Sequence, residues 1–155
     1  MPKRLRRDAS RHELQATRPI STLTVCFRNV LKEVPPELDQ APVLDLCLWS
    51  LLGRHGVGRY MAEIEPAAYR VHAAGVFSMQ AERSRYLMTA QSLLALARVY
   101  ARLGEGATSD KLVLKALLLA ARWLGAGSVA ALTLLATPWW LLQRAAQAWR
   151  GRKRP

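Results

Sequence analysis

Cysteine is scarce in this sequence: 155 residues contain only Cys26 and Cys47. Two cysteines are too few for the disulfide framework of a small secreted scaffold, although a single bond between them stays open in an oxidising compartment. Acidic residues are also few, with 11 Asp and Glu against 23 Lys and Arg. The hydrophobic content of 51% nevertheless excludes a disordered chain, and the short length excludes a large multidomain enzyme.

Motifs that carry catalysis are missing as well. The glycine-rich segment 53–58 has neither the Gly-Lys-Ser/Thr end of a Walker loop nor the G-x-G-x-x-G order, so we expect a connector there. No Gly-x-Ser-x-Gly nucleophile motif occurs. Glu63 and Glu65 would point about 200° apart on a helix, and the histidines and cysteines lack ligand partners at helical spacing. The sequence therefore predicts no enzyme, no cofactor and no metal site.

Sustained alternation of apolar and polar residues is absent too, which excludes most strands and predicts an all-α fold. We expect a basic N-terminal segment over 1–19 and a small bundle of about four short helices over 20–104. A capping box from Ser10 to Glu13 would open a short N-terminal helix. The bundle helices are expected at about 22–34, 42–52, 60–65 continuing after Pro66 toward Met79, and 81–103.

The basic residues gather at the two ends of the chain. Residues 111–155 contain eight Lys or Arg and no acid, and residues 1–12 carry a net charge of +4. Residues 13–110 contain ten basic and ten acidic side chains and are neutral. A nucleic-acid-binding domain would spread its charge over a folded face, so nucleic acid is the least favoured partner. Charge that flanks the most apolar part of the chain favours an anionic membrane surface.

The most apolar part is the uncharged run 123–142, whose twenty residues would cross about 30 Å of hydrocarbon as a helix. Tryptophans lie near its edges, as they do at membrane interfaces: Trp123, Trp139 and Trp140. The run predicts one C-terminal transmembrane helix. The alternative is a buried hairpin of a water-soluble protein that turns at 125–127, against which Pro138 counts.

Basic residues border this run on both sides. In the preceding segment 105–122, Lys111, Lys115 and Arg122 would form one stripe on an amphipathic helix capped at 108–110. The stripe predicts contact with lipid phosphates or acidic partners; an ordinary solvated face is the alternative. The tail 143–155 adds five more predicted lipid contacts, Arg144, Arg150, Arg152, Lys153 and Arg154. The positive-inside rule favours a C-terminus in the cytoplasm or matrix, whereas post-translational insertion would reverse this topology.

These patterns predict a non-catalytic, single-pass accessory or assembly subunit of a larger membrane protein complex, in a mitochondrial or bacterial inner membrane. Small residues would let a neighbouring helix of that complex approach closely: Gly125, Gly127 and Ser128.

A second hypothesis is a tail-anchored regulator that binds a partner helix. Residues 52–59 resemble part of the Gly-Val-Asn-Trp-Gly-Arg signature of Bcl-2-like proteins but lack its Asn-Trp pair. The resemblance covers eight of 155 residues. A basic nucleic-acid-binding protein is the third hypothesis.

Overall fold

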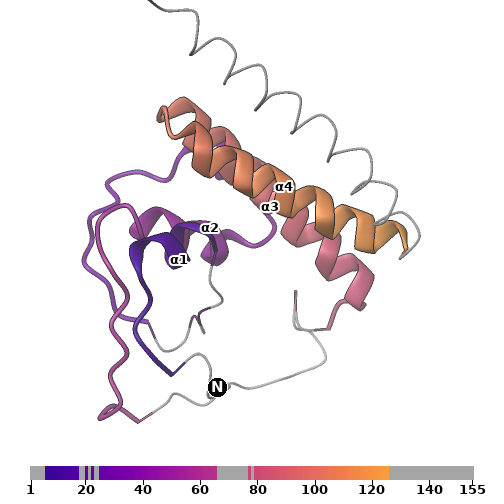
Figure 1. Cartoon of the computed structure of the whole chain (residues 1–155). Helices are drawn as coiled ribbons and strands as arrows, with labels where there is room; N and C mark the ends of the chain where they lie inside the picture. The colour runs from indigo at the N-terminus through magenta and orange to yellow at the C-terminus, as the bar shows by residue number, and fades with distance from the viewer. Residues whose placement is uncertain are drawn as a thin grey trace, which may run out of the picture.

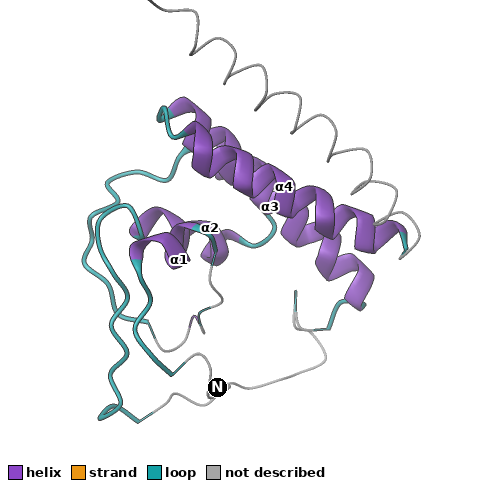
Figure 2. Cartoon of the chain, viewed as in Figure 1, coloured by secondary structure: helices purple, strands orange, loops and turns teal. Residues whose placement is uncertain are grey.

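The computed structural model describes residues 6–17, 20, 22, 25–65, 77 and 79–125. Within these residues the fold is all-α, as predicted (Figure 2). It contains α1 (Arg11–Gln15), the 3-10 helix η3 (Pro36–Leu38), α2 (Leu44–Leu52), α3 (Glu82–Arg102) and α4 (Gly106–Leu124). The described residues form no strand; one isolated bridge pairs Ala9 with Gly58.

The two long helices α3 and α4 lie side by side as an antiparallel hairpin (Figure 1). Gly104 ends the α3 turn with a φ of 76°, a left-handed conformation that glycine adopts without strain. The predicted start of the second helix at 108–110 is wrong, because α4 begins at Gly106. Ser109 is buried against α3 and donates to the carbonyl of Ala97 at 3.0 Å, so it joins the helices.

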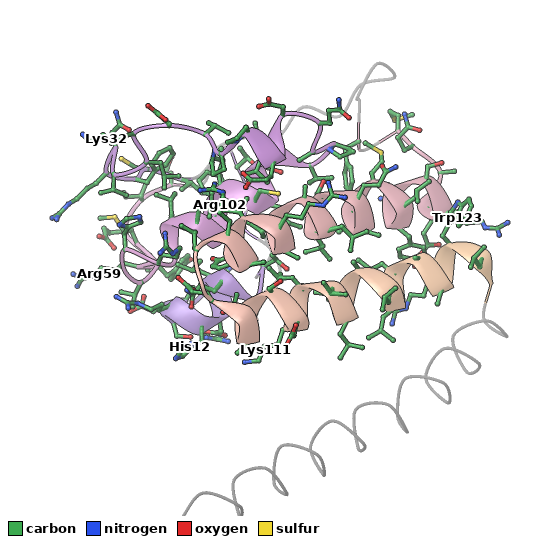
Figure 3. All side chains as sticks on the ribbon, turned by 90° about the horizontal axis from the view of Figure 1, so that it is seen from above. His12, Lys32, Arg59, Arg102, Lys111 and Trp123 are labelled. Carbon is green, nitrogen blue, oxygen red and sulfur yellow. The ribbon has the colours of Figure 1, made fainter. Side chains whose placement is uncertain are left out.

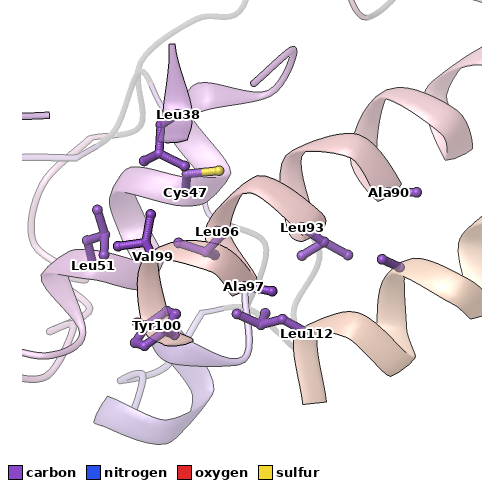
Figure 4. Close-up of a cluster of buried hydrophobic side chains, with 11 residues drawn as sticks. Leu38, Cys47, Leu51, Ala90, Leu93, Leu96, Ala97, Val99, Tyr100 and Leu112 are labelled. Atoms are coloured by element: carbon purple, nitrogen blue, oxygen red, sulfur yellow. The ribbon is translucent and has the colours of Figure 1, made fainter. Parts of the chain in front are cut away.

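The core lies where α2 and η3 meet the hairpin (Figure 4). Tyr100 is fully buried, and its hydroxyl donates to the backbone carbonyl of Ser50 at 2.9 Å. The Ser50 hydroxyl donates in turn to the carbonyl of Gln15 at 2.9 Å, so one polar chain ties α3 to α2 and α1. The largest apolar side chains of the core are Leu38, Leu51, Leu93, Leu96, Val99 and Leu112.

The N-terminal helix has the predicted capping box. The Ser10 hydroxyl accepts from the amide of Glu13 at 3.2 Å, and the Glu13 carboxylate accepts from the amide of Ser10 at 2.9 Å. The helix packs on the end of α2, where Gly53 leaves no room for a side chain. A Cβ at Gly53 would lie 2.7 Å from the Cβ of Leu14.

The predicted helix over 22–34 is wrong, because residues 25–34 have no helical structure. Three of these residues are valines, which lose side-chain freedom in a helix, and Pro35 disfavours helical geometry at Val34. Packing also fails to support a helix here. Only Leu31 packs against the core, while Phe27 lies edge-on to Trp49 at a ring distance of 5.7 Å and stays half exposed.

The predicted helix over 60–65 is also wrong. The amide of Tyr60 donates to the Asp8 carboxylate at 2.8 Å, and Met61 and Ile64 remain exposed. Without a buried face, the segment gains nothing from a helical turn. Its expected continuation after Pro66 lies almost entirely outside the described residues.

The other two bundle helices are confirmed with small shifts, as α2 and α3. Within α3, Ala90, Leu93 and Ala97 are buried, whereas Leu94 and Ala101 are exposed. Ser92, Leu96, Val99 and Tyr100 are buried as well, since α3 packs against α2 and η3 in addition to α4.

No described helix is both long and apolar enough to cross a membrane. Of the predicted span 123–142, the structure describes only residues 123–125; residues 126–142 and the tail 143–155 lie outside the described part.

Candidate functional site

The outward face of α4 carries a row of exposed leucines. Leu112 and Ala116 are buried toward α3, whereas Leu114, Leu117 and Leu118 are 51%, 45% and 39% exposed. Spacing of three and four residues places these three on one side of the helix, and we call them the leucine strip. The strip ends before Ala121, which is buried.

Basic side chains lie along one flank of the leucine strip. Lys111 and Arg122 are exposed, and within the described residues neither makes an ion pair or hydrogen bond through its side chain. Figure 3 shows Lys111 near the start of α4 and Trp123 at its other end. Asp110 is exposed in the first turns of α4 and lies at the end farthest from Trp123. The flank thus carries one exposed cation near each end of the helix.

Lys115, the third member of the predicted basic stripe, is engaged within the fold. Its ammonium group donates to the carbonyl of Ala16 at 3.0 Å and to the hydroxyl of Thr17. Burial lowers the pKa of Lys115, while the oxygens around Nζ stabilise the protonated amine. Sequence spacing could not reveal this contact, because the partners lie nearly one hundred residues earlier in the chain. The two remaining cations of the stripe, Lys111 and Arg122, are exposed.

The last turn of α4 is where the uncharged run begins. Trp123 and Leu124 are 37% and 56% exposed. The guanidinium of Arg83, in the first turn of α3, donates to the Trp123 carbonyl from Nε at 2.8 Å and from Nη2 at 2.6 Å. Gly125 then ends the helix with a φ of 120°, which excludes most other residues.

The remaining predicted contacts cannot be placed. A Cβ at Gly125 would meet no heavy atom within 4 Å among the described residues, so its predicted role in helix packing stays a prediction. The others lie outside the described residues: Gly127, Ser128, Trp139, Trp140, Arg144, Arg150, Arg152, Lys153 and Arg154.

A second feature, which the sequence did not suggest, is an open groove of about 520 Å³ between the 30–36 segment and the end of α3. Its apolar lining includes Val30, Val34 and Leu103. Two arginines at its rim are paired: Arg102 with Glu37, whose pKa it lowers, and Arg54 with Glu105 at 2.7 Å. Residues 30–34, for which the sequence predicted a helix, line the groove in a non-helical conformation.

Groups able to do covalent or metal chemistry are not assembled in the described part of the chain. Burial raises the pKa of the Cys47 thiol to about 12, which makes it unreactive at neutral pH. Cys26 is exposed and not bonded to Cys47. No three His, Cys, Asp or Glu residues among those described could hold a metal ion together.

Comparison with known proteins gives no relative: no family model, no curated protein and no solved structure matches this chain.

Proposed function

We propose that this chain is a non-catalytic, single-pass membrane protein: a small helical domain held by a C-terminal anchor over 123–142, serving as an accessory or assembly subunit of a larger membrane complex. The basic residues on both sides of the anchor bind anionic headgroups. A mitochondrial or bacterial inner membrane suits the charge distribution best.

One observation carries the proposal: the described residues form a core cluster of their own, and the first residues of the uncharged run are exposed. Among the described residues, the core cluster is built from η3, α2, α3 and α4, and its last member along the chain is Ala116. The first two residues of the run, Trp123 and Leu124, are exposed at the end of α4. An apolar run of twenty residues that starts at the surface of a domain needs another apolar environment, which a bilayer supplies.

Extraction of the full chain from membranes tests the anchor. The protein should stay in the pellet in high salt and in alkaline carbonate, leave it only in detergent, and co-purify with a larger assembly. A variant with Leu134→Arg and Leu135→Arg should lose this behaviour, because two central arginines make insertion costly. The matched control places arginines at Leu94 and Leu103, which are exposed on the domain. Recovery of the wild-type chain as a soluble monomer in salt alone contradicts the proposal.

The groove beside η3 supports a second candidate, a tail-anchored regulator that binds a partner helix. Its apolar walls are open to solvent, with Val34 half exposed and Val30 36% exposed. An amphipathic peptide that binds there should protect the 30–36 segment from hydrogen exchange. Leu103→Glu, at the groove wall, should abolish binding, whereas Leu94→Glu should not. A titration without binding removes this candidate.

A further inference from the structure

We infer that α4 lies flat on an anionic lipid surface, with the leucine strip in the acyl boundary and Lys111 and Arg122 at the level of the phosphates. This inference rests on the proposed membrane anchoring and adds which face of the helical domain meets the bilayer.

The leucine strip is the first line of support. Leu114, Leu117 and Leu118 each expose about two fifths or more of their surface, while Leu112 and Ala116 of the same helix fill the interface with α3. The inner face of α4 is therefore packed against α3, and three leucines in one row stay about two fifths to one half exposed. A helix with one packed face, one exposed leucine row and a basic flank has the composition of an interfacial helix.

The positive charge of this part of the chain favours an anionic lipid surface as the partner of the leucine strip. Residues 111–155 hold eight Lys or Arg and no acid, so any surface meeting this part of the chain should be negative. Lys111 and Arg122 lie before and after the leucine strip along the helix and make no ion pair or hydrogen bond through their side chains within the described residues, whereas Lys115 contacts the end of α1. Long basic side chains beside an apolar row can bury their stems and direct their charges to phosphate.

The position of the leucine strip directly before the uncharged run is the third line of support. The uncharged run begins at Trp123, five residues after Leu118 and in the same continuous helix. If the run enters the bilayer, Trp123 lies at the headgroup level, and one turn and a half of helix separates it from Leu118. The rest of α4 then lies either along the membrane surface or at an angle to it. The exposed leucine strip favours an orientation along the surface.

Lipid quenching in the full chain tests this orientation. Leu118→Cys, in a Cys26→Ser background, carries an environment-sensitive fluorophore, and the protein is reconstituted into vesicles with or without phosphatidylglycerol. The control is Arg98→Cys in the same background, at an exposed position of α3. We expect several-fold stronger quenching by a lipid-attached quencher at position 118 than at 98 in anionic vesicles. Leu114→Cys should behave like Leu118→Cys.

The contribution of the basic flank is tested in the same experiment with substituted variants. Lys111→Gln with Arg122→Gln should reduce the quenching at position 118 in anionic vesicles and leave that in neutral vesicles unchanged. Equal quenching at 118 and 98 in protein that sediments with the vesicles overturns the inference and leaves the anchor intact. A probe at 118 that neither lipid nor aqueous quenchers reach overturns it too, since another part of the chain or a second copy then covers the strip. Protein that fails to stay with the vesicles overturns the anchor itself.

Discussion

Lys115 in α4 donates a hydrogen bond of 3.0 Å to the carbonyl of Ala16, the residue that ends α1. A cation at this position satisfies carbonyl groups that a helix end leaves without partners, and its charge suits the negative end of the helix. The contact joins the N-terminal helix to a helix that follows it by nearly one hundred residues. It therefore holds α1 on the flank of the hairpin.

Lys115→Met should loosen α1 without unfolding the core. Charged hydrogen bonds contribute about 1.5–3 kcal/mol when buried, and the partial exposure of Lys115 reduces this to about 1 kcal/mol. Amide hydrogen exchange at Ala16 and Thr17 should accelerate about fivefold. Lys111→Met, at an exposed position without a partner among the described residues, is the control. Unchanged exchange at α1 would show that the ammonium contact adds nothing to its docking.

Glu13 should titrate far below an ordinary carboxyl group. The hydrogen bond from Arg7, followed by that from the Ser10 amide, lowers the pKa of Glu13 to about 2. Because the folded pKa is depressed, the stabilisation is present above the ordinary pKa of about 4.5 and is lost as the pH falls toward 2. NMR detection of the carboxyl carbon should place the midpoint near 2.

Arg7→Gln should raise this midpoint toward the ordinary value, since it removes the largest cause of the shift. Arg28→Gln, a change at another exposed arginine, should leave it in place. A midpoint near 4 in the unsubstituted chain would contradict the Arg7 contact.

Two leucines of the hairpin should respond very differently to truncation. Leu96 is fully buried in α3, so Leu96→Ala should cost about 3 kcal/mol in the free energy of unfolding through lost burial and a cavity. Leu114 in the leucine strip is 51% exposed, so Leu114→Ala should change it by no more than about 0.5 kcal/mol.

The buried thiol of Cys47 gives a measurement of stability that also works in detergent. In a Cys26→Ser background, labelling of Cys47 requires opening of the core, so its rate reports stability. Leu96→Ala should accelerate labelling about a hundredfold, in line with its larger free-energy cost. An equally large effect of Leu114→Ala would mean that the strip belongs to the core, which contradicts the lipid orientation.

Glycine is required at position 53 and not at position 56. In Gly53→Ala the new Cβ would meet the Cβ of Leu14 at 2.7 Å and the carbonyl oxygen of Arg11 at 3.1 Å, so α1 must shift. We expect a loss of about 1–3 kcal/mol, as for other overpacked sites. Gly56→Ala meets no atom within 4 Å and should be neutral or slightly stabilising. Chemical unfolding in mild detergent compares the two; similar midpoints would contradict the tight approach of α1.

Sequence patterns predicted the elements whose signals are local. The capping box at Ser10 and Glu13 and the helix expected over 81–103 both depend on neighbours within a few residues, and both are confirmed, the helix with bounds shifted by one residue at each end. The helix expected at 22–34 failed because its periodic apolar pattern had no partner surface: only Leu31 reaches the core. Periodicity shows that a face could be buried, but tertiary contacts decide whether it is.

For the candidate site, the sequence identified α4 and its basic residues but treated three cations alike. Lys115 differs from Lys111 and Arg122 because its Nζ contacts Ala16 and Thr17 at the end of α1. The spacing of residues within α4 cannot predict this contact. The groove beside η3 was missed for the same reason, since a non-helical segment lines it where the sequence predicted a helix.

The guanidinium of Arg83 closes the hairpin at the end where α4 meets the uncharged run. Its two donors connect the first turn of α3 to the last turn of α4. A force applied to the chain at Gly125 therefore acts on both helices. A pull from the C-terminal side would therefore have to detach α3 and α4 together instead of unwinding α4 from its end. Such a force would move α3 and α4 as one unit, and α2, which packs on α3, would move with them.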